Sequence, residues 1–128
     1  EVDGVLWIND SKATNLASTA VAVAALDRPF VLLLGGRHKG EPYTILADKL
    51  GRCRAVVAYG ESRSLIVRDL EEHVKVVSAT TFERVIETAA KLARPGDAVL
   101  LSPACSSYDM FTNYEERGAR FRQLVEAR

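Results

Sequence analysis

The chain has 128 residues, of which 48% are hydrophobic and 27% charged, and its 17 basic and 17 acidic side chains cancel. This is the composition of an ordinary globular domain, without the positive charge that favours nucleic acid or an anionic membrane surface. No apolar run approaches the roughly 20 residues that cross a bilayer, and no signal peptide is recognisable. Cys53 and Cys105 are too few for a disulfide framework and lack metal-ligand spacing, so we expect reduced thiols in a cytoplasmic protein.

Short apolar runs alternate along the chain with segments of helical periodicity. Strands are predicted at Val5–Ile8, Phe30–Leu34, Arg54–Tyr59, Val74–Val77 and Ala98–Leu101, and helices at Leu16–Leu26, Tyr43–Leu50, around Leu65–Leu70, over Phe82–Ala93 and from about Tyr114. Such alternation implies right-handed crossovers. The predicted fold is therefore α/β: a Rossmann-like three-layer domain over residues 1–128, with a mostly parallel sheet of about five to six strands and helices on both faces.

Three local features refine this prediction. The Ala, Val and Leu content of Leu16–Leu26 suggests a helix buried on most of its surface. Thr80, followed three residues later by Glu83, suggests a capping box at the start of the next-to-last helix. The charged run Glu115–Arg117 is interpreted as the first turn of the last helix, with its acids near the positive helix end.

Three polar loops each follow a predicted strand: Asn9–Asn15 (the first loop), Gly35–Gly40 (the second loop) and Ser102–Asn113 (the third loop). Because parallel strands end at one edge of the sheet, we expect all of these loops to open on that edge, where open α/β sheets bind their ligands. The first loop combines a carboxylate, an ammonium and two hydroxyls beside a helix start, which favours an anionic ligand. The alternative is that Ser11 or Thr14 only caps the helix.

The second loop has three glycines but no nucleotide-phosphate motif, so Lys39 is interpreted as a point charge for a carboxylate or phosphate, or as a solvated turn residue. His38 with Cys105 has no nucleophile signature, and the other histidine, His73, precedes a different strand, so no metal site is predicted. Ser107 is in no nucleophile elbow, and its hydroxyl is better suited to holding a carboxylate.

The aromatic residues Phe111 and Tyr114, near the end of the third loop, are compatible with a ligand platform or with the core. From the residues alone we expect an α/β domain that binds a small anionic ligand at its strand ends.

Longer motifs extend this interpretation. They are Trp7–Asn15 (WINDSKATN), Leu34–Gly36 with Lys39-Gly40, and Leu101–Ser107 (LSPACSS) continuing through Asp109, Phe111, Asn113, Glu115, Arg117 and Gly118. Together they resemble the carboxy-terminal domain of the D-glutamate-adding enzymes of the Mur ligase family, over essentially the whole chain. Since the chain opens on Glu1 and enters a strand almost at once, we expect a domain cut from a longer polypeptide. The resemblance implies that this polypeptide is a three-domain ligase, whose N-terminal and central domains are absent.

The resemblance implies an ATP-dependent ligase of peptidoglycan precursor synthesis. ATP phosphorylates the carboxyl group of UDP-N-acetylmuramoyl-L-alanine, the amine of D-glutamate attacks that acyl phosphate, and the tetrahedral intermediate collapses to an amide and phosphate. ATP and Mg²⁺ would be bound mainly by the central domain, so the fragment alone would contain no catalytic residues and be inactive. We expect a monomer that binds neither nucleic acid nor membranes.

By the same resemblance, D-glutamate contacts lie at Thr14, Lys39, Ser107 and Tyr114, and Asp10 and Lys12 face the nucleotide and the acyl-phosphate region. The sequence departs from the family at Arg37, where Asp is frequent, and at Tyr114, where Phe is usual. Two alternatives stay open. One is a related ligase that adds another amino acid, or glutamate to folate; the other is a stand-alone anion-binding or interaction domain.

Overall fold

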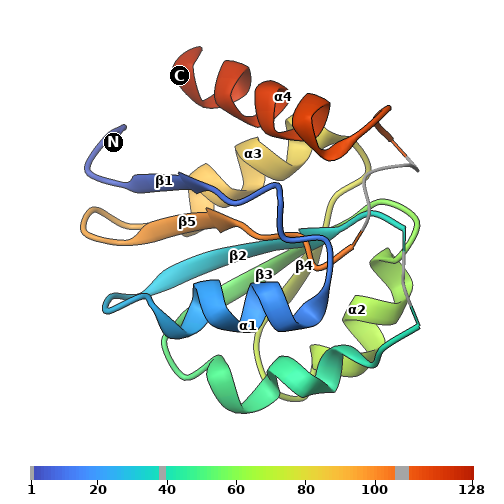
Figure 1. Ribbon diagram of the computed structural model, residues 1–128. Helices are drawn as coiled ribbons and strands as arrows, with labels where there is room; N and C mark the ends of the chain where they lie inside the picture. The colour runs from blue at the N-terminus through green and yellow to red at the C-terminus, as the bar shows by residue number, and fades with distance from the viewer. Residues whose placement is uncertain (1, 38–39, 106–109) are drawn as a thin grey trace.

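The computed structural model describes residues 2–37, 40–105 and 110–128. Within them, the sheet has five strands, all parallel, in the order β1-β5-β2-β3-β4. The strands are β1 (Leu6–Asn9), β2 (Phe30–Gly35), β3 (Cys53–Tyr59), β4 (Val76–Ser78) and β5 (Ala98–Leu101). The predicted parallel sheet is confirmed, and its strand order places β5 between the first two strands of the chain (Figure 1).

Helices cover both faces of this sheet. They are α1 (Leu16–Ala24), the 3₁₀ helix η1 (Tyr43–Lys49), α2 (Arg63–Leu70), α3 (Phe82–Leu92) and α4 (Tyr114–Glu126). Figure 1 shows α1 and α2 on one face, and α3 and α4 on the other. The three-layer α/β fold expected from the sequence is therefore confirmed.

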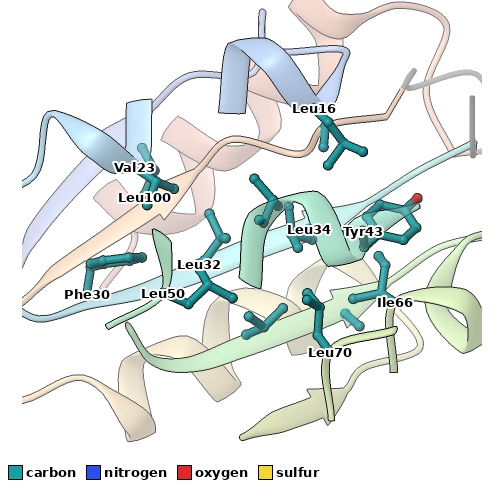
Figure 2. Packing of buried hydrophobic residues seen from close by; sticks show 14 of the residues in the cluster. Leu16, Val23, Phe30, Leu32, Leu34, Tyr43, Leu50, Ile66, Leu70 and Leu100 are labelled. Atoms are coloured by element: carbon teal, nitrogen blue, oxygen red, sulfur yellow. The ribbon is translucent and has the colours of Figure 1, made fainter. Parts of the chain in front are cut away.

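The central strand β2 is buried on both sides, as its continuous apolar run predicts. Phe30, Leu32 and Leu34 point into the cluster beneath α1, η1 and α2. Figure 2 shows this cluster, with Tyr43 at the end near Leu34. Val31 and Leu33 point into the opposite cluster, under α3 and α4. Because successive strand residues face opposite sides, one strand supports two cores and anchors the loop that follows it.

The prediction that the first helix is buried on most of its surface is wrong. Only Leu16, Thr19 and Val23 of α1 are buried, whereas Val21 is 71% exposed. Alanine and leucine favour helix formation whether or not they are covered. Composition therefore identified the helix correctly but overstated its contact with the sheet.

The capping-box prediction at Thr80 is also wrong, by one residue. Thr81 is the N-cap of α3, and its hydroxyl oxygen accepts a hydrogen bond from the Arg84 backbone N–H at 3.2 Å. Glu83 is then one position too early in the helix to complete a capping box. Two adjacent threonines meet the same chemical requirement, and only the backbone geometry distinguishes them.

We therefore expect Thr81→Ala to destabilise the chain by about 1 kcal/mol, through loss of the cap. Thr80→Ala is the matched control, because it removes an identical side chain one residue outside the cap. Urea unfolding of both variants measures the difference. Equal midpoints, or a larger loss for Thr80→Ala, would contradict the assignment of the cap.

Candidate functional site at the carboxyl edge of the sheet

The first and third loops are joined through their backbones at the carboxyl edge of the sheet. The Asp10 N–H donates to the Leu101 carbonyl at 2.8 Å, and the Ala104 N–H donates to the Ala13 carbonyl at 3.0 Å. On the other side of β5, the Gly35 N–H donates to the Pro103 carbonyl at 3.3 Å. The described parts of all three loops therefore meet at one edge, as their positions after parallel strands predicted.

A buried arginine of α4 holds the first loop against the third. The Arg117 side chain is fully buried; its Nε donates to Ser11 Oγ at 3.1 Å and its Nη2 to the Ser11 carbonyl at 2.9 Å. Its Nη1 donates to the Cys105 carbonyl at 3.1 Å. The planar guanidinium thus connects two loops that are far apart in the sequence. Interpreting Glu115–Arg117 only as a first helical turn missed this role.

The neighbouring glycine lets α4 approach the first loop closely. A Cβ atom on Gly118 would lie 3.2 Å from Ser11 Cβ and 3.3 Å from the amide of Asn9. Asn9 Nδ2 donates to the Gly118 carbonyl at 3.1 Å, and Ser11 Oγ donates to the Tyr114 carbonyl at 2.6 Å. The first turn of α4 is therefore fastened to the first loop by both backbone and side chains.

The alternative interpretation, that Ser11 or Thr14 caps the first helix, is wrong. Asn15 is the N-cap of α1, and its Oδ1 accepts from the Ser18 N–H at 2.9 Å. The Ser11 hydroxyl is instead engaged with α4, and Thr14 lies half-buried immediately before the cap. Asparagine is as good a cap as serine, so the sequence contained a signal for Asn15 that was overlooked.

Asp10 and Lys12 lie on the same short loop but in different surroundings. The Asp10 carboxylate accepts a hydrogen bond from Ser102 Oγ at 2.9 Å, whereas Lys12 is exposed. Both line a pocket of about 710 Å³, which is also lined by Val21 of α1 and by Leu26 just after that helix. The carboxylate is thus held in place, while the ammonium extends from the surface.

Tyr114 begins α4 beside the first loop. Asn113 caps this helix by accepting from the Glu116 N–H at 2.8 Å, and the Tyr114 side chain is 37% exposed. Lys12 and Tyr114 line the same hollow of about 310 Å³. The structure thus brings together these two predicted site residues. The other aromatic residue, Phe111, packs edge-on against Phe82 and belongs to the core.

Lys39 and Ser107 lie outside the described residues, as does His38. The backbone that leads to them is described. Gly36 and Gly40 have positive φ values of 126° and 95°, which glycine adopts readily. The Gly36 carbonyl accepts from the Ser62 N–H at 2.9 Å, and Arg37 forms an exposed ion pair with Glu61 at 3.4 Å. Arg37, where the sequence departs from the family, therefore has an ion-pair partner on the loop that follows β3.

A buried polar cluster supports the described start of the third loop. Tyr43 Oη lies 3.0 Å from Cys105 Sγ, and Ser62 Oγ lies 3.6 Å from the same sulfur. Burial, followed by the contact with Cys105, raises the pKa of Tyr43 well above its ordinary value, so the phenol stays neutral. Sequence reasoning missed this cluster, because its members come from segments that only the fold brings together.

No group of three or more His, Cys, Asp or Glu side chains in the described ranges is arranged to hold a metal ion. Both cysteines are thiols rather than partners in a disulfide, as predicted, and burial raises the pKa of Cys53 to about 12. No described helix has the length and apolar character needed to cross a membrane.

Comparison with known proteins identifies the class of domain. The family model for the Mur ligase, glutamate ligase domain matches residues 1–105. The chain belongs to this family, as the motifs of all three loops predicted.

Its relatives extend the comparison to nearly the whole chain. It is 52% identical over 127 residues to the UDP-N-acetylmuramoylalanine–D-glutamate ligase of Salinibacter ruber, covering 98% of this chain and 28% of that protein. Ligases of the same name from Rubrobacter xylanophilus and Chlorobium chlorochromatii are 47% and 43% identical, over 100% and 97% of the chain and 30% and 27% of their own lengths. The chain therefore spans less than a third of the length of these curated relatives.

A solved structure supports the fold alone. It is a domain of a protein described as a UDP-N-acetylmuramate:L-alanyl-gamma-D-glutamyl-meso-diaminopimelate ligase from Haemophilus ducreyi. The match has a TM-score of 0.56 at 15% identity and covers 98% of this chain and 93% of that domain.

Proposed function

We propose that residues 1–128 form the carboxy-terminal, D-glutamate-binding domain of a three-domain ligase that joins D-glutamate to UDP-N-acetylmuramoyl-L-alanine. The observation that carries this proposal is the meeting of the first and third loops at one edge of the sheet, with Lys12 and Tyr114 around the same hollow. The names of the relatives support the substrate. These relatives are 43–52% identical to this chain over nearly its whole length, so the resemblance concerns the whole of this domain.

D-glutamate carries two carboxylates, which suit the chemistry of these loops. In the proposal Lys39 supplies an ammonium, and Thr14 and Ser107 supply hydroxyls, while Tyr114 lies against the amino acid. Asp10 and Lys12 face the nucleotide and the acyl phosphate. The D-glutamate amine then forms a bond to the acyl carbon, the bond from that carbon to the phosphate oxygen breaks, and phosphate leaves as the amine gives up its proton. The domain's part is to orient the amine donor.

ATP and Mg²⁺ are the proposed cofactors of the whole ligase. The described residues offer no cluster of metal ligands, so we assign both mainly to the central domain that the resemblance implies. The chain alone is then inactive. A ligase that uses ATP and a UDP-linked precursor would act in the cytoplasm, and we propose that it acts there as a monomer.

Lys39→Ala in the full-length ligase tests the D-glutamate site. Removing a charge-assisted hydrogen bond worth roughly 1.5–3 kcal/mol is expected to weaken D-glutamate binding by about ten- to a hundredfold. The Michaelis constant for ATP should stay the same, and so should folding, because a loop lysine contributes little to the core. Lys39→Arg should rescue poorly, since a planar fork approaches a carboxylate differently from a point charge.

Lys49→Ala is the matched control, because Lys49 is an exposed lysine at the end of η1. The purified chain, which is expected not to turn over ATP, gives the background rate of the assay. A higher constant for ATP with an unchanged constant for D-glutamate would assign Lys39 to the nucleotide. If neither constant moves, the lysine is a solvated turn residue. A full-length protein that binds an anion but forms no amide would favour the stand-alone binding domain.

A further inference from the structure

We propose that Ser102 and Thr19 are positioning residues that hold the Asp10 carboxylate in place for the ligase reaction. The inference rests on the proposed function, which places Asp10 on the nucleotide and acyl-phosphate side of the site. Neither Ser102 nor Thr19 carries an assigned ligand contact. Both act through Asp10 rather than on a substrate.

Hydrogen-bond geometry supports this assignment. Ser102 and Thr19 are both fully buried. Ser102 Oγ lies 2.9 Å from Asp10 Oδ2 and 3.2 Å from Thr19 Oγ1, and Thr19 Oγ1 lies 2.9 Å from the Ser102 carbonyl oxygen.

The supply of hydrogens decides the direction of each bond. A hydroxyl has one hydrogen to donate, and a carboxylate or carbonyl oxygen has none. The Thr19 hydrogen goes to the Ser102 carbonyl, because that carbonyl can only accept. The Ser102 hydrogen goes to the Asp10 carboxylate, since a charged acceptor forms the stronger bond. Thr19 thus fixes the Ser102 backbone carbonyl, and the Ser102 hydroxyl fixes the carboxylate, with Thr19 Oγ1 as the more distant acceptor of the same hydroxyl.

The strand register explains why these residues meet. Asn9 pairs with Leu101 across β1 and β5, and the Asp10 N–H continues the pairing to the Leu101 carbonyl. Asp10 is therefore held beside Ser102 by the backbone as well as by the side chain. Thr19 is one turn into α1, where its N–H donates to the carbonyl of the cap residue Asn15 at 3.3 Å. The carboxylate itself accepts from the Ser102 hydroxyl, and the backbone bonds hold Asp10 and Thr19 in their positions next to Ser102.

A functional carboxylate needs such support to keep one orientation, because groups that touch ligands are held by the packing and hydrogen bonds of their neighbours. The alternative is a purely structural role, in which Ser102 and Thr19 only connect β5 to α1 and contribute to stability. Dependence on Asp10 separates the two roles. A positioning residue loses its effect once Asp10 is removed, whereas a structural residue keeps it.

The experiment is a double-mutant cycle in the full-length ligase, measuring kcat and the Michaelis constants for ATP and D-glutamate. Ser102→Ala and Thr19→Val are each expected to lower kcat/KM for ATP by about tenfold, with the D-glutamate constant unchanged. Thr19→Ser keeps the hydroxyl and is the matched control, expected to stay within about twofold of the parent. In an Asp10→Ala background, Ser102→Ala should change activity by less than about twofold.

Equal losses from Ser102→Ala in both backgrounds would overturn the inference, as would full activity of both Ser102→Ala and Thr19→Val. Full activity of Asp10→Ala would remove the assigned role of Asp10 and the inference with it. Absence of amide formation by the parent enzyme would instead reject the proposed function. In that case NMR of the chain decides the inference: a slowly exchanging Ser102 hydroxyl proton that disappears in Asp10→Ala supports it, and a rapidly exchanging one contradicts it.

Discussion

Arg117→Met is expected to destabilise the chain by about 3 kcal/mol or more, because two buried carbonyl oxygens lose their donor and each such loss costs about 1–3 kcal/mol. Methionine fills a similar volume, so the variant isolates the hydrogen bonds from the packing of the side-chain stem. The carbonyls concerned belong to Ser11 and Cys105. Urea unfolding of the purified chain measures the loss.

Arg122→Met is the matched control. Arg122 is on the same helix, but its side chain is 70% exposed and its ion pair with Glu126 is on the surface, so we expect a change within about 0.5 kcal/mol. Arg117→Lys keeps the charge without the fork, and is expected to fall between the parent and Arg117→Met. An unfolding midpoint for Arg117→Met equal to that of the control would show that the buried guanidinium does not join the two loops energetically.

Gly35→Ala is the second change with a large expected effect. A Cβ atom at Gly35 would lie 2.5 Å from the Tyr59 carbonyl oxygen and 2.6 Å from the Tyr59 ring. Both obstacles are buried, and one is backbone of the neighbouring strand, so β2 must shift away from β3. We expect a loss of about 3 kcal/mol, at the upper end of the range for overpacking. Gly35 is also the first residue of the second loop, so in the full-length ligase the D-glutamate constant should rise as well.

Gly51→Ala distinguishes this clash from the general effect of replacing a glycine. Nothing lies within 4 Å of a Cβ at Gly51, and its backbone is not in the left-handed region. Alanine there is expected to stabilise the chain by about 0.4–1 kcal/mol, by restricting the unfolded state. Denaturant midpoints of the two variants provide the comparison. A Gly35→Ala variant as stable as the parent would mean that the strands separate at little cost at this point.

The glycines of the second loop therefore serve different purposes. A loop with three glycines can need them for unusual backbone angles or for the close approach of a neighbouring segment. Gly36 and Gly40 do have positive φ, but Gly35 is needed because Tyr59 leaves no room for a side chain. A glycine required for close approach and one required for its φ look alike in a sequence. Only the position of the neighbouring strand distinguishes them.

The sequence by itself determined the element types and the fold class. The continuous apolar run of β2 and the helical spacing of α3 are local patterns, and each reports which sides of its own segment are covered. The positions of the three loops after parallel strands were sufficient to predict that they meet at one edge. The motifs in those loops were sufficient to predict the family, which the comparisons confirm.

Only the tertiary structure decided which residues hold those loops together. The burial of Arg117 and the approach of Ser102 to Asp10 depend on β5 lying beside β1, although about 90 residues separate the two strands in the sequence. Local periodicity carries no information on strand order, because that order is set by the packing of distant segments. The caps at Asn15 and Thr81 differ from prediction for a related reason: adjacent residues could all supply the oxygen, and the backbone path selected one.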